Sequence, residues 1–106
     1  MIRVFISQPM DELSDEQIYK IRAEAERSVR KKFGRDLSVF VFGSPPKTEG
    51  YAPSDVKNSP LWYLGVSIEM LADADVAYFV DGWKNARECI MEHEACKLYG
   101  IDIIKD

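Results

Sequence analysis

The chain has 106 residues, which is enough for one hydrophobic core, so we expect residues 1–106 to form a single domain. With 46% hydrophobic and 30% charged residues, the composition is that of a globular protein. The net charge of −4 argues against binding to duplex nucleic acid, which requires a basic face.

The first half of the sequence predicts two strands and one long helix. Residues 2–6 have the pattern of a buried strand. After a loop, Ser14 and Gln17 form a capping-box pattern that starts a helix, which runs to about Phe33 and ends at Gly34. The inward stripe of this helix is predicted to be Ile18, Ile21, Ala25 and Val29. Residues 37–42 predict the second strand.

The second half begins with a long loop over 43–58, and a loop of this length in a small domain is usually functional or mobile. Ser59 is then predicted to cap a second helix, with Pro60 at its first position. The remaining elements are predicted as a strand at 75–80, a tight turn at 81–83, a helix at 85–99 and a strand at 101–104.

This alternation of strands and helices predicts an α/β fold. We expect a flavodoxin-like or Rossmann-like three-layer sandwich with four or five parallel strands. Ligands of such folds bind outside the carboxyl ends of the strands. The candidate site residues should therefore come from the loops 7–13, 43–58 and 81–84, and from the helix starts that follow them.

The cysteines and the first residues of the sequence indicate the cellular compartment in which we expect the protein. Cys89 and Cys96 lie seven residues apart in one predicted helix, on one face but too far apart along the axis for a disulfide. The sequence has no CxxC and no Cys/His metal pattern, so we expect reduced thiols and neither a metal nor a cofactor. No signal sequence and no membrane-spanning run is recognisable, which favours a cytoplasmic protein without a membrane partner.

Glu92 is the candidate reactive carboxylate. The inward stripe of the last helix is predicted to be Ala86, Cys89, His93 and Cys96. Glu92 lies at the border of this stripe, with Glu88 one turn earlier. A half-buried carboxylate there can act as a nucleophile or a base, whereas the alternative is a solvated Glu88–Glu92 stripe.

Other side chains near the predicted site each have two interpretations. His93, the only histidine, is either a core residue or a group that orients or protonates a ligand. Trp83 and Tyr51, in two of the edge loops, either stack on a nucleobase or pack against a neighbouring helix, and for Trp62 we favour packing. The loop of Ser7, Gln8 and Pro9 follows a buried strand and can offer donors to an anion, although it is not a glycine-rich phosphate loop.

Three segments carry a family resemblance: VFISQPMDELSDEQI, PLWYLGVSIEMLADADVAYFVDGW and ARECIMEHEACKLYGIDII. Together they cover nearly the whole chain except the long second loop. They resemble a bacterial and phage group that is similar to nucleoside 2-deoxyribosyltransferases and deoxynucleoside-monophosphate N-glycosidases.

The resemblance implies a flavodoxin-like fold and a homo-oligomer, either a dimer or a tetramer. It implies that Glu92 attacks the anomeric carbon of the sugar and forms a covalent glycosyl-enzyme. It also implies that Ser7, Gln8 and Pro9 hold the sugar or its phosphate. Asp81, Gly82 and Trp83 would form the loop that leads into the nucleophile helix.

Three positions depart from the pattern of those enzymes. Ser67 stands where they have an aspartate that assists proton transfer to the leaving base, so the proton donor is unidentified. Ala86 replaces a phosphate-binding serine, and Glu88 replaces a small glycine. A second carboxylate repels a phosphate and raises the pKa of a neighbouring carboxylate, so 5′-phosphate substrates are disfavoured.

The leading hypothesis is an enzyme that cleaves an N-glycosidic bond, or transfers deoxyribose, in a small nucleoside or nucleotide. Glu92 is its nucleophile, and His93 or a group from a neighbouring subunit stands in for the missing acid. Glu88 and Trp83 contribute to the site. The alternative is a module that binds a nucleotide or a nucleotide-derived signal without cleaving it. An interaction protein that keeps only the fold, and a flavin mononucleotide carrier, are further alternatives from fold analogy.

Overall fold

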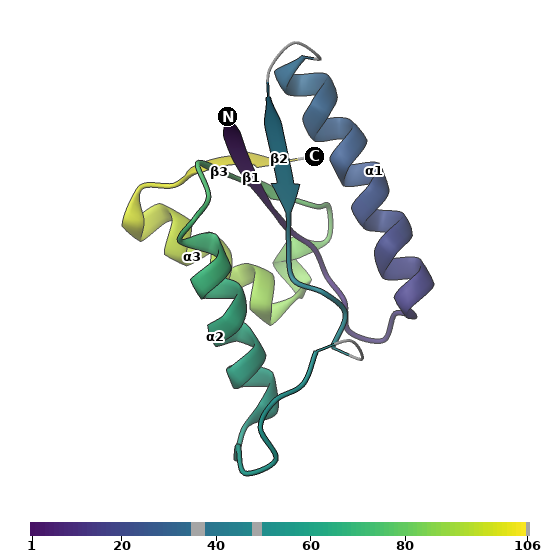
Figure 1. Ribbon diagram of the computed structural model, residues 1–106, viewed down its shortest axis with the longest axis vertical. Coiled ribbons are helices and arrows are strands. Elements are labelled where there is room, and N and C mark those ends of the chain that lie inside the picture. Colours follow the sequence, from purple (N-terminus) through teal and green to yellow (C-terminus); the bar gives the residue numbers. More distant parts are fainter. Residues whose placement is uncertain (35–37, 48–49, 106) are drawn as a thin grey trace.

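The computed structural model describes residues 1–34, 38–47 and 50–105 (Figure 1). Strands and helices alternate along the chain in the predicted order. The elements are β1 (Ile2–Ser7), α1 (Asp15–Phe33), β2 (Val39–Phe42), α2 (Ser59–Leu71), β3 (Val76–Phe79), the 3-10 turn η1 (Trp83–Asn85), α3 (Arg87–Tyr99) and β4 (Asp102–Lys105).

The four strands of the described residues form one parallel sheet in the order β2-β1-β3-β4. Val4 of β1 pairs with Val41 of β2 on one side and with Val76 of β3 on the other. The chain runs outward from β1 to β2, returns to β3 and then runs outward to β4. The direction of winding therefore changes between β1 and β3, and ligands of doubly wound folds bind at the carboxyl end of that position.

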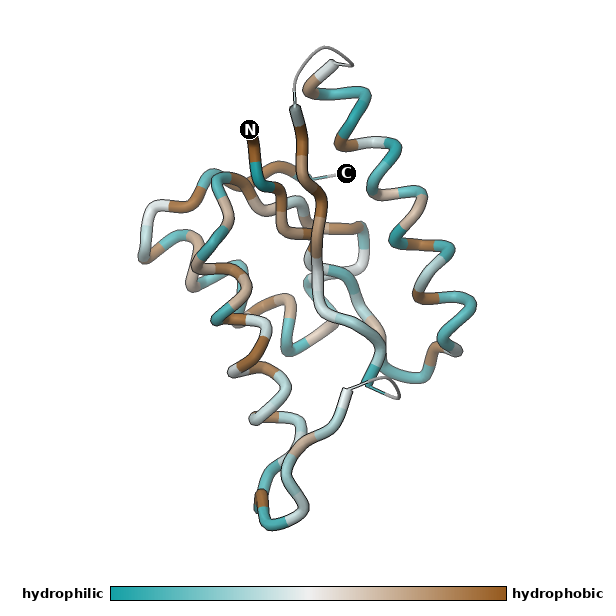
Figure 2. Tube along the Cα trace, viewed as in Figure 1, coloured by the Kyte–Doolittle hydropathy of each residue, from teal (hydrophilic) through white to brown (hydrophobic). Residues whose placement is uncertain are grey.

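Helices cover both faces of the sheet, which confirms the predicted three-layer α/β sandwich (Figure 1). On one face Val4 and Ile6 of β1 pack with Ala25 and Val29 of α1. On the other face Phe5 packs in a cluster that includes residues of α2 and α3. Figure 2 shows hydrophobic residues concentrated along the strands, whereas α1 is mostly hydrophilic with hydrophobic residues at intervals.

The helix starts differ slightly from the predicted ones. The capping box of Ser14 and Gln17 is present at α1, as predicted. At α2 the cap is Asn58 rather than Ser59, because the Asn58 side chain accepts a hydrogen bond of 3.1 Å from the backbone N–H of Leu61. The third helix begins at Arg87 instead of residue 85, because Trp83–Asn85 form a 3-10 turn after Gly82.

The buried face of α3 differs from the predicted stripe. Cys89, Glu92 and Cys96 are buried, whereas His93 is only partly buried. Glu92 can turn inward because a hydroxyl group of β1 meets its carboxylate, so the helix is rotated toward Glu92 relative to a purely apolar stripe. Both cysteines are free and buried. None of the described helices has the length and apolarity that crossing a membrane requires.

The segment between β2 and α2 extends beyond the sheet and returns along the first turns of α2 (Figure 1). It leaves β2 at Gly43 and reaches the helix cap at Asn58. This segment follows the carboxyl end of β2, so it forms one wall of the edge at which a ligand of this fold is expected.

Candidate functional site

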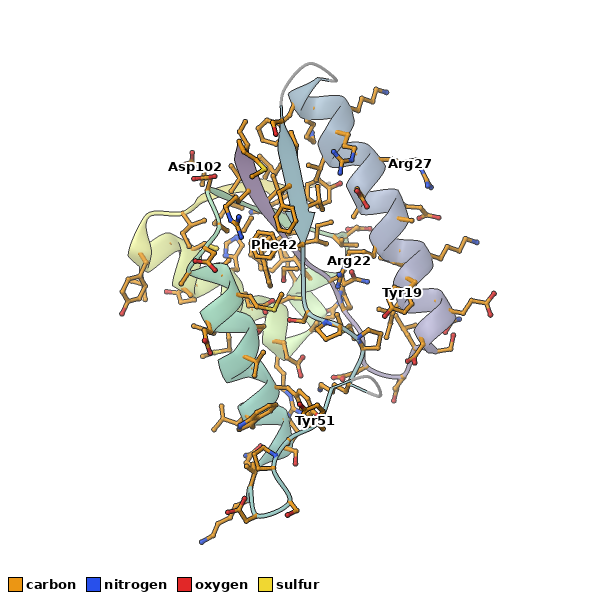
Figure 3. All side chains as sticks on the ribbon, in the orientation of Figure 1. Tyr19, Arg22, Arg27, Phe42, Tyr51 and Asp102 are labelled. Carbon is orange, nitrogen blue, oxygen red and sulfur yellow. The ribbon has the colours of Figure 1, made fainter. Side chains whose placement is uncertain are left out.

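A pocket of about 400 Å³ lies at the carboxyl edge of the sheet. Its walls come from β1 and the loop after it, from the segment after β2, and from α2 and α3. The polar and charged residues that line it are Gln8, Asp11, Ser44, Lys47, Ser67, Glu88 and Glu92, and its aromatic residues are Phe5, Tyr51, Trp62 and Tyr63. Tyr51 lies beside the first turns of α2, in the segment that closes this end of the molecule (Figure 3).

Glu92 is a buried carboxylate in the wall of this pocket, with 4% of its surface exposed. The hydroxyl of Ser7, at the end of β1, donates a hydrogen bond of 2.7 Å to Oε1 of Glu92. Burial raises the pKa of Glu92 above its usual range, while the nearby hydroxyls of Ser67 and Ser7 and the more distant charge of Arg22 act in the opposite direction. A carboxylate that is held by a donor and borders an apolar pocket is equipped to act as a nucleophile.

Ser67 is also buried in the pocket wall, on the inner face of α2. Its hydroxyl has one proton, which it donates to the backbone carbonyl of Leu64 at 3.0 Å. Proximity to Ser67 favours the ionised form of Glu92, but the geometry identifies Ser7 as the donor to that carboxylate. The position that the resemblance assigns to an acid therefore holds a hydroxyl that a backbone group already engages.

Arg22 of α1 forms hydrogen bonds to two walls of the pocket, the loop after β1 and the segment after β2 (Figure 3). Its Nε donates to Oε1 of Gln8, and its guanidinium also donates to the carbonyl of Ser44 at 2.6 Å. The amide of Gln8 in turn donates to the carbonyl of Ile18 at 3.0 Å. Burial lowers the pKa of Arg22, yet an arginine stays cationic in proteins, so its charge favours an ionised Glu92.

Lys47 connects two carboxylates at another part of the pocket. Its ammonium group lies 3.4 Å from Glu88 and 3.6 Å from Asp11. Arg87 also lies 3.5 Å from Glu88. Partial burial acts to raise the pKa of Glu88, but a backbone hydrogen bond and Lys47 outweigh it, and the pKa lies below the usual value. Glu88 is therefore ionised near neutral pH and does not serve as a proton donor.

Asp81, Gly82 and Trp83 belong to a different surface. They line a smaller hollow of about 310 Å³ after β3, together with Lys84 and Lys105. The imidazole of His93 stacks on the Trp83 ring, with centroids 4.1 Å apart. Burial and the charges of Lys105 and Lys97 lower the pKa of His93. A methyl group at Gly82 would lie 3.7 Å from Pro9, so Pro9 is near this surface as well.

The structure thus divides the residues that the sequence singled out into two groups. Gln8, Glu88 and Glu92 line the larger pocket, and Ser7 bonds directly to Glu92. Asp81, Gly82 and Trp83 line the smaller hollow, Pro9 lies near Gly82, and His93 stacks on Trp83. Two adjacent residues of α3 belong to different groups, because Glu92 faces the larger pocket while His93 faces Trp83.

Two basic residues at the pocket were not singled out from the sequence. Arg22 occupies the inward side of α1, four residues after the buried Ile18, and an arginine at such a position is a recognisable signal for a buried polar network. Lys47 follows two prolines in the long loop, and only the fold shows which carboxylates it meets.

These features define a doubly wound parallel α/β protein with a buried carboxylate in a pocket at the carboxyl edge of its sheet. No family model, curated protein or solved structure matches the chain. Across residues 1–34, 38–47 and 50–105, no group of three or more His, Cys, Asp or Glu side chains is arranged to hold a metal ion.

Proposed function

We propose that this protein cleaves the N-glycosidic bond of a small nucleoside-like molecule with Glu92 as the nucleophile, and passes the sugar to water or to a second base. The observation that carries the proposal is the buried Glu92 carboxylate, held by Ser7 at the wall of the pocket. The same residue is the one that the sequence resemblance assigns to attack on the sugar.

The size and lining of the pocket suit such a substrate. Small-molecule sites have volumes of roughly 300–1,000 Å³ and combine apolar walls with a few polar groups. At about 400 Å³, this pocket can hold one nucleoside. Trp62, Tyr63 and Tyr51 line it, so we place the base against these rings rather than against Trp83, whose ring is covered by His93.

In the proposed reaction an oxygen of Glu92 attacks C1′ of the sugar while the bond from C1′ to the base nitrogen breaks. Water or a second base then attacks C1′ of the glycosyl ester and releases the Glu92 carboxylate. Ser7 keeps the carboxylate in one orientation, and the charge of Arg22 favours its ionised form. Gln8 and the carbonyl of Ser44 are fixed by Arg22, which keeps the pocket walls in place.

A nucleotide-binding module without turnover is the second candidate function. The observation in its favour is Ser67, which replaces the acid expected from the resemblance and donates its proton to Leu64. Binding that stabilises the substrate and the transition state equally gives no acceleration. The same experiment separates this function from the first.

The test is an incubation of the protein with deoxyribonucleosides, ribonucleosides and their 5′-monophosphates, with released base measured by chromatography. Glu92→Gln keeps the shape of the side chain but removes the nucleophile, and we expect it to abolish release. Glu94→Gln is the matched control, because Glu94 is exposed on the same helix and pairs with Lys97 at 3.7 Å. Release that persists in Glu92→Gln would contradict the proposal, and a thermal shift without release would support the binding module.

A further inference from the structure

We propose that the base of the preferred substrate carries a positive charge before it leaves, so that the substrate is a nucleoside of an N-alkylated purine or of a pyridinium ring. This inference rests on the proposed function, because it names the substrate class of the same pocket. It follows from the charges, the rings and the acids that line that pocket.

The charges favour a cation. Asp11, Glu88 and Glu92 supply three carboxylates to the pocket lining, and among the described lining residues Lys47 is the sole cation. Arg22 and Arg87 contact residues of the pocket but do not line it. Lys47 is shared between two of these carboxylates, at 3.4 Å from Glu88 and 3.6 Å from Asp11. A pocket lined mainly by one sign of charge, with apolar walls that exclude water, concentrates ligands of the opposite sign.

The aromatic rings suit a flat cation as well. Tyr51, Trp62 and Tyr63 line the pocket, and the rings of Trp62 and Tyr63 meet edge to face with centroids 5.2 Å apart. The face of a tryptophan or tyrosine ring attracts a cation through its quadrupole. It therefore binds a cationic ring more strongly than a neutral ring of the same shape. A cationic base is therefore recognised by both the carboxylates and the rings.

The chemistry of the leaving group points to the same class. A neutral base departs as an anion unless a group protonates it, which is the work of a general acid. Among the described carboxylates of the pocket, Glu92 is the nucleophile and Asp11 pairs with Lys47. Glu88 is held ionised by a backbone hydrogen bond, by Lys47 and by Arg87.

A base that is already cationic needs no proton. As the oxygen of Glu92 bonds to C1′, the electron pair of the C1′–N bond moves onto the ring nitrogen and cancels its positive charge, and the base leaves as a neutral molecule. Water then attacks C1′ of the glycosyl ester. Its proton passes to the solvent, the free sugar is released and the Glu92 carboxylate is restored.

A binding measurement tests the charge preference without turnover. In the Glu92→Gln variant, 7-methylguanosine is compared with 7-methyl-7-deazaguanosine, which has nearly the same shape and is neutral. At slightly acidic pH we expect the cation to bind roughly tenfold more tightly. Adding Glu88→Gln or Asp11→Asn should reduce this preference, whereas adding Glu94→Gln, a substitution outside the pocket, should leave it unchanged. Equal binding of the two ligands would overturn the inference.

A turnover measurement separates this inference from the proposed function. The wild-type protein is incubated with 7-methylguanosine and with guanosine, in ribo and 2′-deoxy forms, and each rate is corrected by the rate with Glu92→Gln. We expect release of 7-methylguanine at least tenfold faster than release of guanine. Faster release of guanine would overturn the inference and leave the proposed function standing. Release from neither substrate would overturn the inference, and it would overturn the proposed function as well only if no other nucleoside of the panel released its base.

Discussion

The hydroxyl oxygen of Ser7 lies 2.7 Å from Oε1 of Glu92, and this hydrogen bond joins two residues that are 85 positions apart in the chain. Ser7 is the last residue of β1, and Glu92 lies in the second turn of α3. Both side chains are buried. The contact therefore fixes the rotation of α3 on the sheet and the orientation of the carboxylate at the same time.

Replacing Ser7 by alanine should weaken both the fold and the site. The variant leaves a buried carboxylate without its donor, which costs about 1–3 kcal/mol of unfolding free energy. Because the Ser7 hydroxyl lowers the pKa of Glu92, its loss should raise that pKa further and move the acidic limb of the activity profile to higher pH.

Urea unfolding and the pH dependence of base release measure these two effects. Ser54→Ala, at an exposed position in the segment between β2 and α2, is the control and should leave both properties close to those of the wild type. A Ser7→Ala variant with wild-type stability and an unchanged acidic limb would show that the hydroxyl neither stabilises nor orients Glu92.

The fold was predictable from the sequence because its signals are local. The capping box of Ser14 and Gln17 predicts where α1 begins, and the apolar runs predict four strands between three helices. The predicted edge of the sheet also holds the pocket that contains Gln8, Glu88 and Glu92. These features depend on spacing within a few residues or on the rule that parallel strands end at one edge.

The rest of the site depends on contacts that the sequence does not encode locally. A helical wheel ranks His93 as more inward than Glu92, because it counts apolar neighbours and cannot include the Ser7 hydroxyl from β1. Likewise, Trp83 and Glu92 are close in sequence, but the 3-10 turn places the ring against His93 instead of in the larger pocket.

Stability should depend on pH through Glu92 in a defined direction. Burial raises the pKa of Glu92 in the folded protein above its value in the unfolded chain, which for a glutamate is about 4.3. The folded state therefore binds the proton more tightly. The resulting stabilisation is fully present below the unfolded pKa and is lost as the pH rises through the folded pKa.

Glu92→Gln removes this titration. The unfolding free energy of the variant minus that of the wild type should therefore be highest at neutral pH and should fall as the pH is lowered. Thermal or urea unfolding of both proteins over a range of pH gives this difference, in which the other titrating groups largely cancel. Glu94→Gln reports the effect of removing one exposed carboxylate from the same helix. A difference between Glu92→Gln and wild type that rises on acidification would contradict the assigned direction.

The two cysteines should be unreactive in the folded protein. Burial raises the pKa of Cys89 to about 12 and the pKa of Cys96 to about 11, so neither forms much thiolate at mildly alkaline pH. We expect a disulfide reagent such as Ellman's reagent to modify both thiols only after unfolding in urea. Rapid modification of one thiol in the native protein, with Cys89→Ala and Cys96→Ala identifying which, would contradict this prediction.

Gly43 and Gly65 should respond to alanine in opposite directions. A methyl group at Gly43 would lie 2.9 Å from the carbonyl oxygen of Ile6 and 2.9 Å from Cζ of Arg22. The Ile6 carbonyl belongs to β1 and cannot move freely, so the clash should cost about 1–3 kcal/mol. It should also displace Arg22 from Gln8 and Ser44, which lowers the rate of base release.

At Gly65, within α2, the added methyl group meets nothing within 4 Å, and the higher helix propensity of alanine should stabilise the protein by up to about 1 kcal/mol. Urea unfolding of the two variants beside the wild type measures both changes in stability, and the base-release assay measures the change in rate. Equal shifts in the same direction would show that the contact between Gly43, β1 and Arg22 does not hold the pocket wall in place.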